Sequence, residues 1–274
     1  MTKKAPDLFR VDGRHALIAG GAGLLGSMFA EALLEAGSLV TILDASPERL
    51  KEASRRLRRF GAKLNALPCD LTRQEQVAGA VAAAEKRSPL KILVNAAAID
   101  PKTDSRADSE RLARGFVDYP AALWRQSMEV NLTGLFLVTQ EVCRRFERRK
   151  TGIVVNISST YGLVGPDQDL YRNPDGTRTF KPGDYSTTKA GLIGFTRYLA
   201  AYYAGTAIRV NCLTPGGADN HHAPWFAKAY GARTTLGRMA RPDEYKGPIL
   251  FLCSDASSYM TGANLVVDGG WTAR

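Results

Sequence analysis

The sequence is poor in the residues that build metal and redox centres. Its 274 residues include 4 cysteines and 3 histidines. No two cysteines form a C-x-x-C pair, so neither a linked zinc site nor a dithiol redox motif is expected. Cys69 and Cys212 lie in apolar runs, which predicts buried free thiols. The four cysteines are Cys69, Cys143, Cys212 and Cys253.

The histidines add little as metal ligands. His221 and His222 are adjacent, so they do not both face one metal ion in the usual way. Asp219 is close in sequence, but no Asp, Glu or His partner stands at ligand spacing. We therefore predict no metal site and interpret the surrounding stretch as a mobile, polar lid.

Long apolar runs are also missing. No run of about 18 uncharged apolar residues occurs, so no membrane-spanning helix and no membrane partner are expected. Residues Met1–Arg10 are polar and lack the apolar core of a signal peptide. No internal repeat or low-complexity tract is visible. These absences predict a cytoplasmic enzyme.

Acidic residues are fewer than basic ones. There are 27 Asp and Glu against 37 Lys and Arg, which leaves a net charge of +10. The basic residues cluster at 55–59 and 144–150, near predicted helix C-termini, where cations complement the helix dipole. We therefore expect exposed helix faces and no nucleic-acid partner, although an anionic substrate would gain from the same charge.

What the chain does have is a repeated alternation of strands and helices. Hydrophobic residues make up 45% of the sequence, enough for a sizeable core. The pattern predicts an α/β protein: a single-domain, Rossmann-like doubly wound fold with a seven-stranded, mostly parallel sheet flanked by helices. Strands are predicted at 15–19, 39–43, 63–69, 90–94, 152–157, 208–213 and 265–267, and helices at 27–37, 47–60, 73–87, 121–149, 185–204 and 242–254.

No linker divides the chain, so residues 1–274 are expected to form one dinucleotide-binding and catalytic domain. Three polar or turn-rich excursions, at about 99–120, 160–183 and 217–240, interrupt the alternation. In open parallel sheets, ligands bind at the carboxyl ends of the strands. Long excursions next to that edge are therefore expected to shape a substrate site.

A glycine-rich turn joins the first predicted strand to the first predicted helix. Gly20, Gly23 and Gly26 follow a G-x-x-G-x-x-G spacing, which lets backbone amides and the helix N-terminus approach a pyrophosphate. Asp44 ends the next strand, where a carboxylate accepts hydrogen bonds from ribose hydroxyls and repels a 2′-phosphate. This favours NAD over NADP, and Arg49 nearby is the main argument against that preference.

Polar and small residues end or interrupt several later elements. Asp70 follows the third predicted strand and either caps the next helix or contacts an adenine ring, and the sequence leaves both open. Asn95 opens a run of small residues, 95–98, that lets a ligand approach the backbone. Asn131 interrupts the long apolar helix at 121–149. Ser159 comes directly after the fifth predicted strand.

Tyr185 and Lys189 are four residues apart on a predicted helix and therefore point the same way. A phenol has an ordinary pKa of about 10, and a neighbouring ammonium lowers it toward the range in which a general acid/base works. The same spacing occurs by chance on many amphipathic helices. The pair therefore gains its meaning from the rest of the chain.

Taken in order, these residues resemble the short-chain dehydrogenase/reductase family. The resemblance covers essentially the whole chain, from the strand at His15 to Asp268-Gly269-Gly270, and its specific part is the order of the motifs. They are the glycine-rich first turn, Asp70-Leu71-Thr72, Asn95-Ala96-Ala97-Ala98, Asn131, Ser158-Ser159, Tyr185-x-x-x-Lys189 and Pro215-Gly216.

The resemblance implies a catalytic tetrad. Tyr185 would exchange a proton with the substrate oxygen, and Ser159 would hold that oxygen. Lys189 would lower the pKa of Tyr185 and bind the nicotinamide ribose, and Asn131 would seat a water that relays protons. Lowering the phenol pKa to about 7 requires roughly 4 kcal/mol, which Lys189 and an oxidised nicotinamide would supply together.

The resemblance also implies a set of nucleotide contacts. They are Gly20, Gly23, Leu24, Leu25, Gly26, Asp44, Asp70, Leu71, Asn95, Ala96, Ala97, Tyr185, Lys189, Pro215 and Gly216.

Three features depart from the common family pattern. Ala19 and Leu24 replace the Thr and the middle Gly of the T-G-x-x-x-G-x-G turn, and Ala98 stands where Gly is common. Ser159 and Tyr185 are about twice as far apart as usual, because of the excursion at 160–183. That excursion is similar to a bacterial subgroup linked to surface-sugar and flagellin-glycan biosynthesis.

The sequence therefore predicts an NAD-dependent oxidoreductase of a secondary alcohol or its ketone, with a polar, sugar- or polyol-like substrate. Arg172, Arg178 and Lys181 in the excursion suit such a hydroxyl-rich or anionic molecule. The alternatives are an NADPH-dependent reductase of a 3-oxoacyl or other small carbonyl compound, and a non-catalytic nucleotide-binding protein. The resemblance further implies a homo-oligomer, a tetramer or a dimer.

Overall fold

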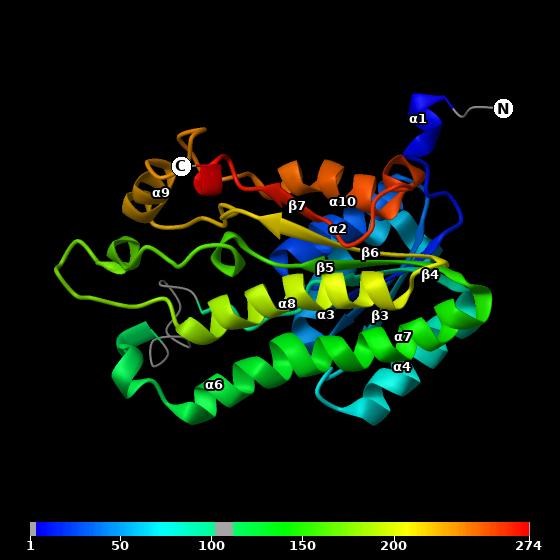
Figure 1. Ribbon diagram of the computed structural model, residues 1–274, viewed down its shortest axis with the longest axis horizontal. Coiled ribbons are helices and arrows are strands. Elements are labelled where there is room, and N and C mark those ends of the chain that lie inside the picture. Colours follow the sequence, from blue (N-terminus) through cyan, green and yellow to red (C-terminus); the bar gives the residue numbers. More distant parts are fainter. Residues whose placement is uncertain (1–3, 102–111, 274) are drawn as a thin grey trace.

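The computed structural model describes residues 4–101 and 112–273, and they form a seven-stranded sheet with helices on both faces (Figure 1). Every strand pairs in parallel with its neighbours, in the order β3-β2-β1-β4-β5-β6-β7. The predicted Rossmann-like architecture is confirmed. The strands are β1 (His15–Ala19), β2 (Leu39–Asp44), β3 (Leu64–Pro68), β4 (Leu90–Asn95), β5 (Thr151–Ile157), β6 (Ala207–Pro215) and β7 (Asn264–Val267).

The helices follow the predicted alternation with shifted bounds. The predicted helix at 47–60 ends at Arg56 and continues as a 3-10 turn over Arg58–Lys63. The longer helices are α2 (Leu24–Glu35), α3 (Pro47–Arg56), α4 (Gln74–Arg87), α6 (Ala121–Met128), α7 (Leu135–Arg149), α8 (Gly183–Tyr202), α9 (Pro224–Gly231) and α10 (Lys246–Cys253).

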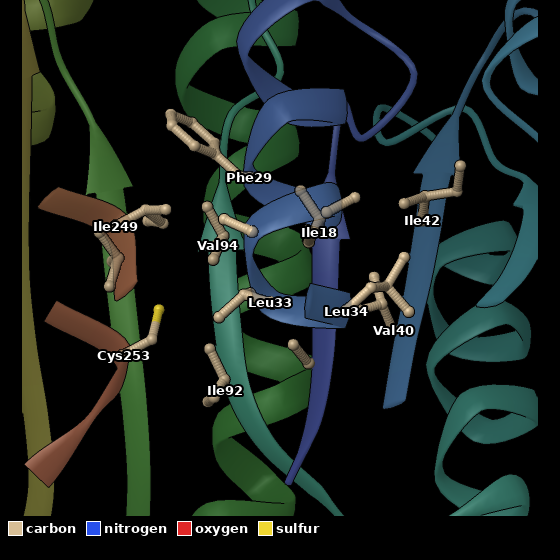
Figure 2. Packing of buried hydrophobic residues seen from close by; sticks show 14 of the residues in the cluster. Ile18, Phe29, Leu33, Leu34, Val40, Ile42, Ile92, Val94, Ile249 and Cys253 are labelled. Atoms are coloured by element: carbon tan, nitrogen blue, oxygen red, sulfur yellow. The ribbon is translucent and has the colours of Figure 1, made fainter. Parts of the chain in front are cut away.

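Two apolar cores lie on the two faces of the sheet because strand side chains alternate direction. Ile18 of β1 packs under α2 and α10, together with Phe29 and Ile249, as Figure 2 shows. Its neighbour Leu17 faces the opposite core, which α4, α7 and α8 cover. Because the strands are buried on both faces, they appear in the sequence as continuous apolar runs. All four cysteines are buried free thiols.

The predicted helix at 121–149 is interrupted where Asn131 lies. α6 is followed by a single π-helical segment, Glu129–Gly134, and then by α7. Such π-segments widen the helix by one residue and are frequent at functional sites.

The excursions gather where the strands end. The segment 160–183 is built from two 3-10 turns, Thr160–Gly162 and Gln168–Tyr171, and it lies beside α9 at the left of Figure 1. The third excursion, 217–240, holds a regular helix, α9, where the sequence predicted a polar lid. For the first excursion, residues 102–111 of the predicted loop lie outside the described residues.

The predicted basic clusters form ion pairs with neighbouring helices. Arg59 donates to Glu31 and Glu35 of α2, and Arg149 at the end of α7 pairs with Glu85 of α4. These contacts tie adjacent helices together. Over the described part of the chain, no helix has the length and apolarity needed to span a membrane.

Candidate active site

A cavity of about 690 Å³ lies at the carboxyl ends of β1, β2, β4, β5 and β6. Its position is the one expected for a ligand site in an open parallel sheet, where the strand order reverses between β1 and β4. Most of the sequence-predicted site residues line it. They are Gly20, Gly23, Leu24, Leu25, Gly26, Asp44, Asp70, Leu71, Ala96, Ala97, Ser159, Tyr185, Lys189, Pro215 and Gly216.

The glycine-rich turn is held by close backbone contacts. Gly20 has φ +74°, and a Cβ atom built on it would lie 2.5 Å from the backbone of Ala97. A Cβ atom on Gly26 would lie 2.1 Å from the carbonyl oxygen of Gly20. Both positions therefore require glycine. Leu24 occupies the first turn of α2, where its side chain meets no such restriction.

The N-terminus of α2 opens into the cavity. Gly23 caps the helix without a side-chain hydrogen bond, and the first turn contains no acidic residue. The first N–H groups of a helix carry partial positive charge and bind phosphate. With Ala96 and Ala97 opposite, the turn has the shape and polarity that a dinucleotide pyrophosphate needs.

Asp44 ends β2 and is almost fully buried. Its Oδ1 accepts the backbone N–H of Ser46 at 3.1 Å and the Arg49 guanidinium at 2.8 Å. The Arg49 side chain is 59% exposed, and it also lines the cavity. The carboxylate and the guanidinium thus lie side by side at the end of the cavity next to β2.

Two predicted nucleotide contacts have structural partners. The Asp70 carboxylate lines the cavity, but its Oδ1 accepts both the N–H and the hydroxyl of Thr72, so it closes the turn before α4. Asn95 is fully buried and outside the cavity lining. Its amide donates at 2.8 Å to Thr139 and to Asn156, tying β4 to α7 and β5.

Ser159 is brought to Tyr185 by a tight turn against α8. The turn Thr160–Gly162 follows β5 directly, and a Cβ atom on Gly162 would lie 2.7 Å from the carbonyl carbon of Lys189. The Ser158 hydroxyl donates to the carbonyl of Lys189 at 2.8 Å. The Ser159 and Tyr185 side chains both line the cavity. The excursion therefore lengthens the sequence between them without separating them.

Lys189 lies in the buried end of the cavity. Its Nζ donates to the carbonyl of Ile157 at 2.8 Å and lies 5.7 Å from the centre of the Tyr185 ring. Burial lowers the pKa of Lys189 to about 8. The ammonium charge near Tyr185 is therefore easily lost.

The pKa of Tyr185 moves in the direction opposite to the sequence-based expectation. Burial raises the pKa well above 10.0, and the Asp100 carboxylate adds to the effect, whereas the hydrogen bond with Ser159 opposes it. The folded chain alone thus favours the neutral phenol. A lowered pKa needs positive charge in addition to that of Lys189.

Asn131 lies in the π-segment and is fully buried. Its carboxamide oxygen accepts the N–H of Ile99 at 2.7 Å, and its amide donates to the Ile99 carbonyl and to Thr188, each at 3.2 Å. It thereby joins the loop after β4 to α8 one residue before Lys189. Like Asn95, it is not part of the cavity lining.

Asp184 is a buried neighbour of Tyr185 that the sequence argument missed. This carboxylate is buried at the start of α8, where it accepts from Ser127 at 2.6 Å and from Tyr119 at 2.8 Å. It also accepts the N–H of Tyr185 at 2.6 Å. The bonds link α6 to α8 and fix where the Tyr185 helix begins. Its place directly before Tyr185 was the only available signal.

Aromatic side chains from the excursions at 160–183 and 217–240 form the end of the cavity farthest from the glycine-rich turn. Tyr161, Tyr171, Phe226, Tyr230 and Met239 belong to one buried cluster with Tyr185. The Tyr171 hydroxyl donates to Tyr161 at 3.1 Å. Sequence reasoning missed these residues because they come from segments with no periodic pattern.

Three cations were predicted in the excursion at 160–183, and of these only Lys181 reaches the cavity. Arg172 pairs with Asp169, and Arg178 stacks on Phe180. His222 also lines the cavity, stacked on Phe226. Within residues 4–101 and 112–273, no group of three or more His, Cys, Asp or Glu residues is placed to hold a metal ion.

Comparison with known proteins agrees with this geometry. A family model described as Enoyl-(Acyl carrier protein) reductase matches residues 21–272. The chain is 34% identical to cis-4-hydroxycyclohexanecarboxylate dehydrogenase of Sinomonas cyclohexanicum, over 95% of this chain and 97% of that one. It is 33% identical to a 3-oxoacyl-(acyl-carrier-protein) reductase of Aquifex aeolicus, over 95% and 98%. It is 31% identical to galactitol 2-dehydrogenase (L-tagatose-forming) of Cereibacter sphaeroides, over 97% of each.

Solved structures carry the same fold with either nucleotide. A short-chain dehydrogenase from Leptospira borgpetersenii with bound NAD+ superposes with a TM-score of 0.81 at 30% identity, covering 99% of this chain and 97% of that one. A gluconate 5-dehydrogenase from Burkholderia cenocepacia, in complex with NADP and tartrate, gives 0.83 at 30%, covering 99% and 100%. None of these names supports the surface-sugar and flagellin-glycan subgroup. The chain belongs to the short-chain dehydrogenase/reductase family and is an NAD(P)-dependent oxidoreductase.

Proposed function

We propose that this protein transfers hydride between NAD and a secondary alcohol or its ketone, and that the substrate is polar and sugar- or polyol-like. The observation that carries the proposal is the meeting of Ser159, Tyr185 and Lys189 in the same cavity as the glycine-rich turn. Ser159 follows β5, Tyr185 and Lys189 lie on α8, and the turn joins β1 to α2.

In this proposal Tyr185 gives a proton to, or takes one from, the substrate oxygen, and Ser159 hydrogen-bonds the same oxygen. Lys189 contributes positive charge beside the phenol and binds the nicotinamide ribose. The nicotinamide supplies the hydride chemistry. Asn131 fixes Ile99 and Thr188 around Lys189, and its part in a proton relay stays a prediction.

The preference for NAD rests on Asp44. Its buried carboxylate lines the cavity at the end of β2, and in this proposal it accepts hydrogen bonds from the ribose hydroxyls, where a 2′-phosphate would meet a negative charge. Arg49 favours NADP, but its guanidinium is already paired with Asp44. Fluorescence titration of both nucleotides tests the preference, with at least about tenfold tighter binding of NAD expected.

The polar substrate is supported by the charged groups at the far end of the cavity. Lys181 and Asp100 lie there among aromatic side chains, and hydroxyl-rich molecules pair polar groups with apolar carbon faces. Relatives named for galactitol and gluconate fit this chemistry.

Substitution of Tyr185 by Phe is the decisive experiment. It removes the hydroxyl and keeps the ring, so turnover should fall by about 10³-fold while NAD affinity stays within about twofold. Retained turnover with a panel of polyols and cyclic alcohols would contradict the mechanism.

A second candidate activity is reduction of a 3-oxoacyl compound, because a 3-oxoacyl-(acyl-carrier-protein) reductase is 33% identical to this chain. That activity would use NADPH and a 3-oxoacyl thioester. Measuring kcat/KM for acetoacetyl-CoA with NADPH against galactitol with NAD separates the two. A higher value for the thioester would replace our proposal.

We also propose a homo-oligomer, a tetramer or a dimer, with α7 and α8 in the interface. Phe136 on α7 and the stacked Tyr198 and Tyr202 on α8 are exposed aromatic side chains on these neighbouring helices. Exposed aromatic patches of this kind are typical of protein interfaces. Light scattering of the purified protein tests this, and a monomer at micromolar concentration would refute it.

A further inference from the structure

An ion pair between a buried lysine and a partly exposed aspartate lies against Tyr185. The Lys181 side chain is 7% exposed, and its Nζ is 4.4 Å from the centre of the Tyr185 ring. The ammonium donates to the Asp100 carboxylate and, at 3.1 Å, to the carbonyl of Pro101. Both charged residues line the cavity at its substrate end.

The excursions at 160–183 and 217–240 hold Lys181 in this place. The Gln168 side chain accepts the Lys181 N–H at 2.9 Å and donates to its carbonyl at 3.0 Å, so one amide grips both backbone groups. Next to it, Asp167 pairs with Arg233 after α9. This arrangement fixes the backbone from which the ammonium enters the cavity.

Stability is a poor explanation for the pair. Removing an ammonium from water costs several kcal/mol, and apolar residues of similar volume often stabilise such sites as well or better. The aromatic cluster around Tyr161 and Tyr171 lines the same cavity and offers apolar contacts at this position. A ligand that uses the polar atoms explains the pair better.

The pair offers one donor and one acceptor to such a ligand. An ammonium has three N–H groups, and Asp100 and Pro101 take two of them. The Asp100 side chain is 44% exposed, and its Oδ2 has no partner among the described residues. A hydroxyl group accepts one hydrogen bond and donates another, so it complements both atoms at once.

We propose that Lys181 and Asp100 together bind a hydroxyl group on the carbon next to the reacting carbon. The substrates are then vicinal diols and the corresponding α-hydroxy ketones. This inference rests on the proposed function, because Tyr185 has to hold the reacting oxygen while the ammonium over its ring holds the neighbouring one. The pair makes the site selective for two adjacent oxygens.

Other substrate classes fit the pair less well. A carboxylate bound to Lys181 would lie against the Asp100 carboxylate, and like charges at that range are repulsive. An acyl chain would bury the free donor and acceptor without replacing their hydrogen bonds with water, which costs about 1–3 kcal/mol for each group.

Three matched probes test the proposal with NAD: cyclohexanol, cis-cyclohexane-1,2-diol and cis-4-hydroxycyclohexanecarboxylate. They share a ring and a secondary alcohol and differ in the second group. For the parent protein we expect kcat/KM for the diol to exceed that for cyclohexanol by roughly 100-fold, since a site built to bind a hydroxyl rejects an analogue without it.

The informative variant is the double substitution Lys181→Met with Asp100→Leu, which removes both charges and leaves neither buried alone. It should lose about 100-fold in kcat/KM for the diol and stay within about threefold for cyclohexanol. Lys181→Arg should keep part of the preference, because it retains charge and donors. NAD affinity and thermal stability report whether each variant is folded.

Lys246→Met is the matched control. Lys246 also forms buried or half-buried ion pairs, with Glu31 and Glu35, but it lies on α10 away from the cavity. Its kcat/KM values for all three probes should be those of the parent.

Each contrary result has a distinct meaning. Equal losses on diol and cyclohexanol would place the pair's effect on Tyr185 and overturn the proposal, as would a parent that shows no diol preference. A larger loss on the carboxylate probe would identify an anion site instead. Absence of hydride transfer to any probe, or to the galactitol and acetoacetyl-CoA pairs above, would refute the proposed function itself.

Discussion

The two ends of the cavity, which we propose bind the nucleotide and the substrate and name accordingly, are built in different ways. At the nucleotide end, backbone atoms and small residues close together in sequence form the surface, as Gly20 and Gly26 show. At the substrate end, large side chains from distant segments meet, as in the pairing of Asp167 with Arg233. The difference teaches that the nucleotide end depends on residues small enough for close backbone contacts, whereas the substrate end depends on contacts between large side chains.

The largest effect should come from filling the closest backbone contact. Gly26→Val places a side chain 2.1 Å from the Gly20 carbonyl oxygen, so the turn has to deform. We expect a loss of at least about 3 kcal/mol in the free energy of unfolding, and no measurable NAD binding, by chemical denaturation and titration.

Gly79→Ala is the control for that change, because no atom lies within 4 Å of a Cβ built there on the exposed face of α4. It should stabilise the protein by about 0.5–1 kcal/mol. Tight NAD binding by the Gly26 variant would show that the nucleotide end tolerates side chains after all.

A second effect, up to about 3 kcal/mol, concerns Lys189 where the two ends meet. Its pKa is lowered from 10.5 to about 8 by burial. Between these values the unfolded chain binds more protons than the folded one, so folding stability rises with pH. Relative to Lys189→Met, the parent should therefore gain stability as pH rises from 8 to 10.5.

Urea unfolding of both proteins at several pH values measures this difference. Other titrating groups are common to both and cancel in the comparison. A pH-independent difference would mean that Lys189 keeps an ordinary pKa in the folded protein.

The third effect tests nucleotide choice. Asp44→Asn keeps an acceptor for the Ser46 N–H but removes the negative charge and releases Arg49. NAD affinity should fall about tenfold and NADP affinity should rise, since a free guanidinium favours a phosphate. Fluorescence titration gives both constants.

Arg49→Gln serves as the companion variant. It should weaken NADP binding and leave NAD binding within about twofold. If Asp44→Asn leaves the ratio of the two affinities unchanged, nucleotide choice is made elsewhere in the site.

The smallest effect is expected for the contact between the excursions at 160–183 and 217–240. Asp167→Asn removes a partly exposed ion pair with Arg233, so the free energy of unfolding should fall by no more than about 1 kcal/mol. The kcat/KM for a diol should drop a few-fold, and NAD affinity should not change. Asp243→Asn is the control, because Asp243 forms an exposed ion pair with Arg241. It should change neither the kcat/KM for a diol nor the NAD affinity. A weaker NAD affinity in Asp167→Asn would mean that the two ends are coupled.

Local patterns were sufficient to predict which residues line one end of the cavity and that Tyr185 and Lys189 lie in it together. The strand, glycine turn and helix around Gly20 are consecutive, and Tyr185 and Lys189 share one helix face. Ser159, which follows a buried strand, lines the same cavity. Such features follow from spacing and from backbone geometry, which do not depend on the rest of the chain.

Long-range contacts were not predictable in the same way. Asn95 was predicted as a nucleotide contact, yet its side chain lies between β4, β5 and α7, where its NH2 group donates to Thr139 and Asn156. The helix α9 forms where polar residues suggested a lid, because Phe226 and Tyr230 pack on the aromatic cluster. Partners of this kind are set by packing.

The sequence by itself determined the parallel sheet, the glycine turn and the tyrosine–lysine helix, because each depends on residues close together in the chain. Only the tertiary structure decided that the lengthened path from Ser159 to Tyr185 folds back to place Lys181 against the Tyr185 ring. Lys181 and Asp100 are 81 positions apart, and they pair because the excursion at 160–183 lies against the chain just after β4.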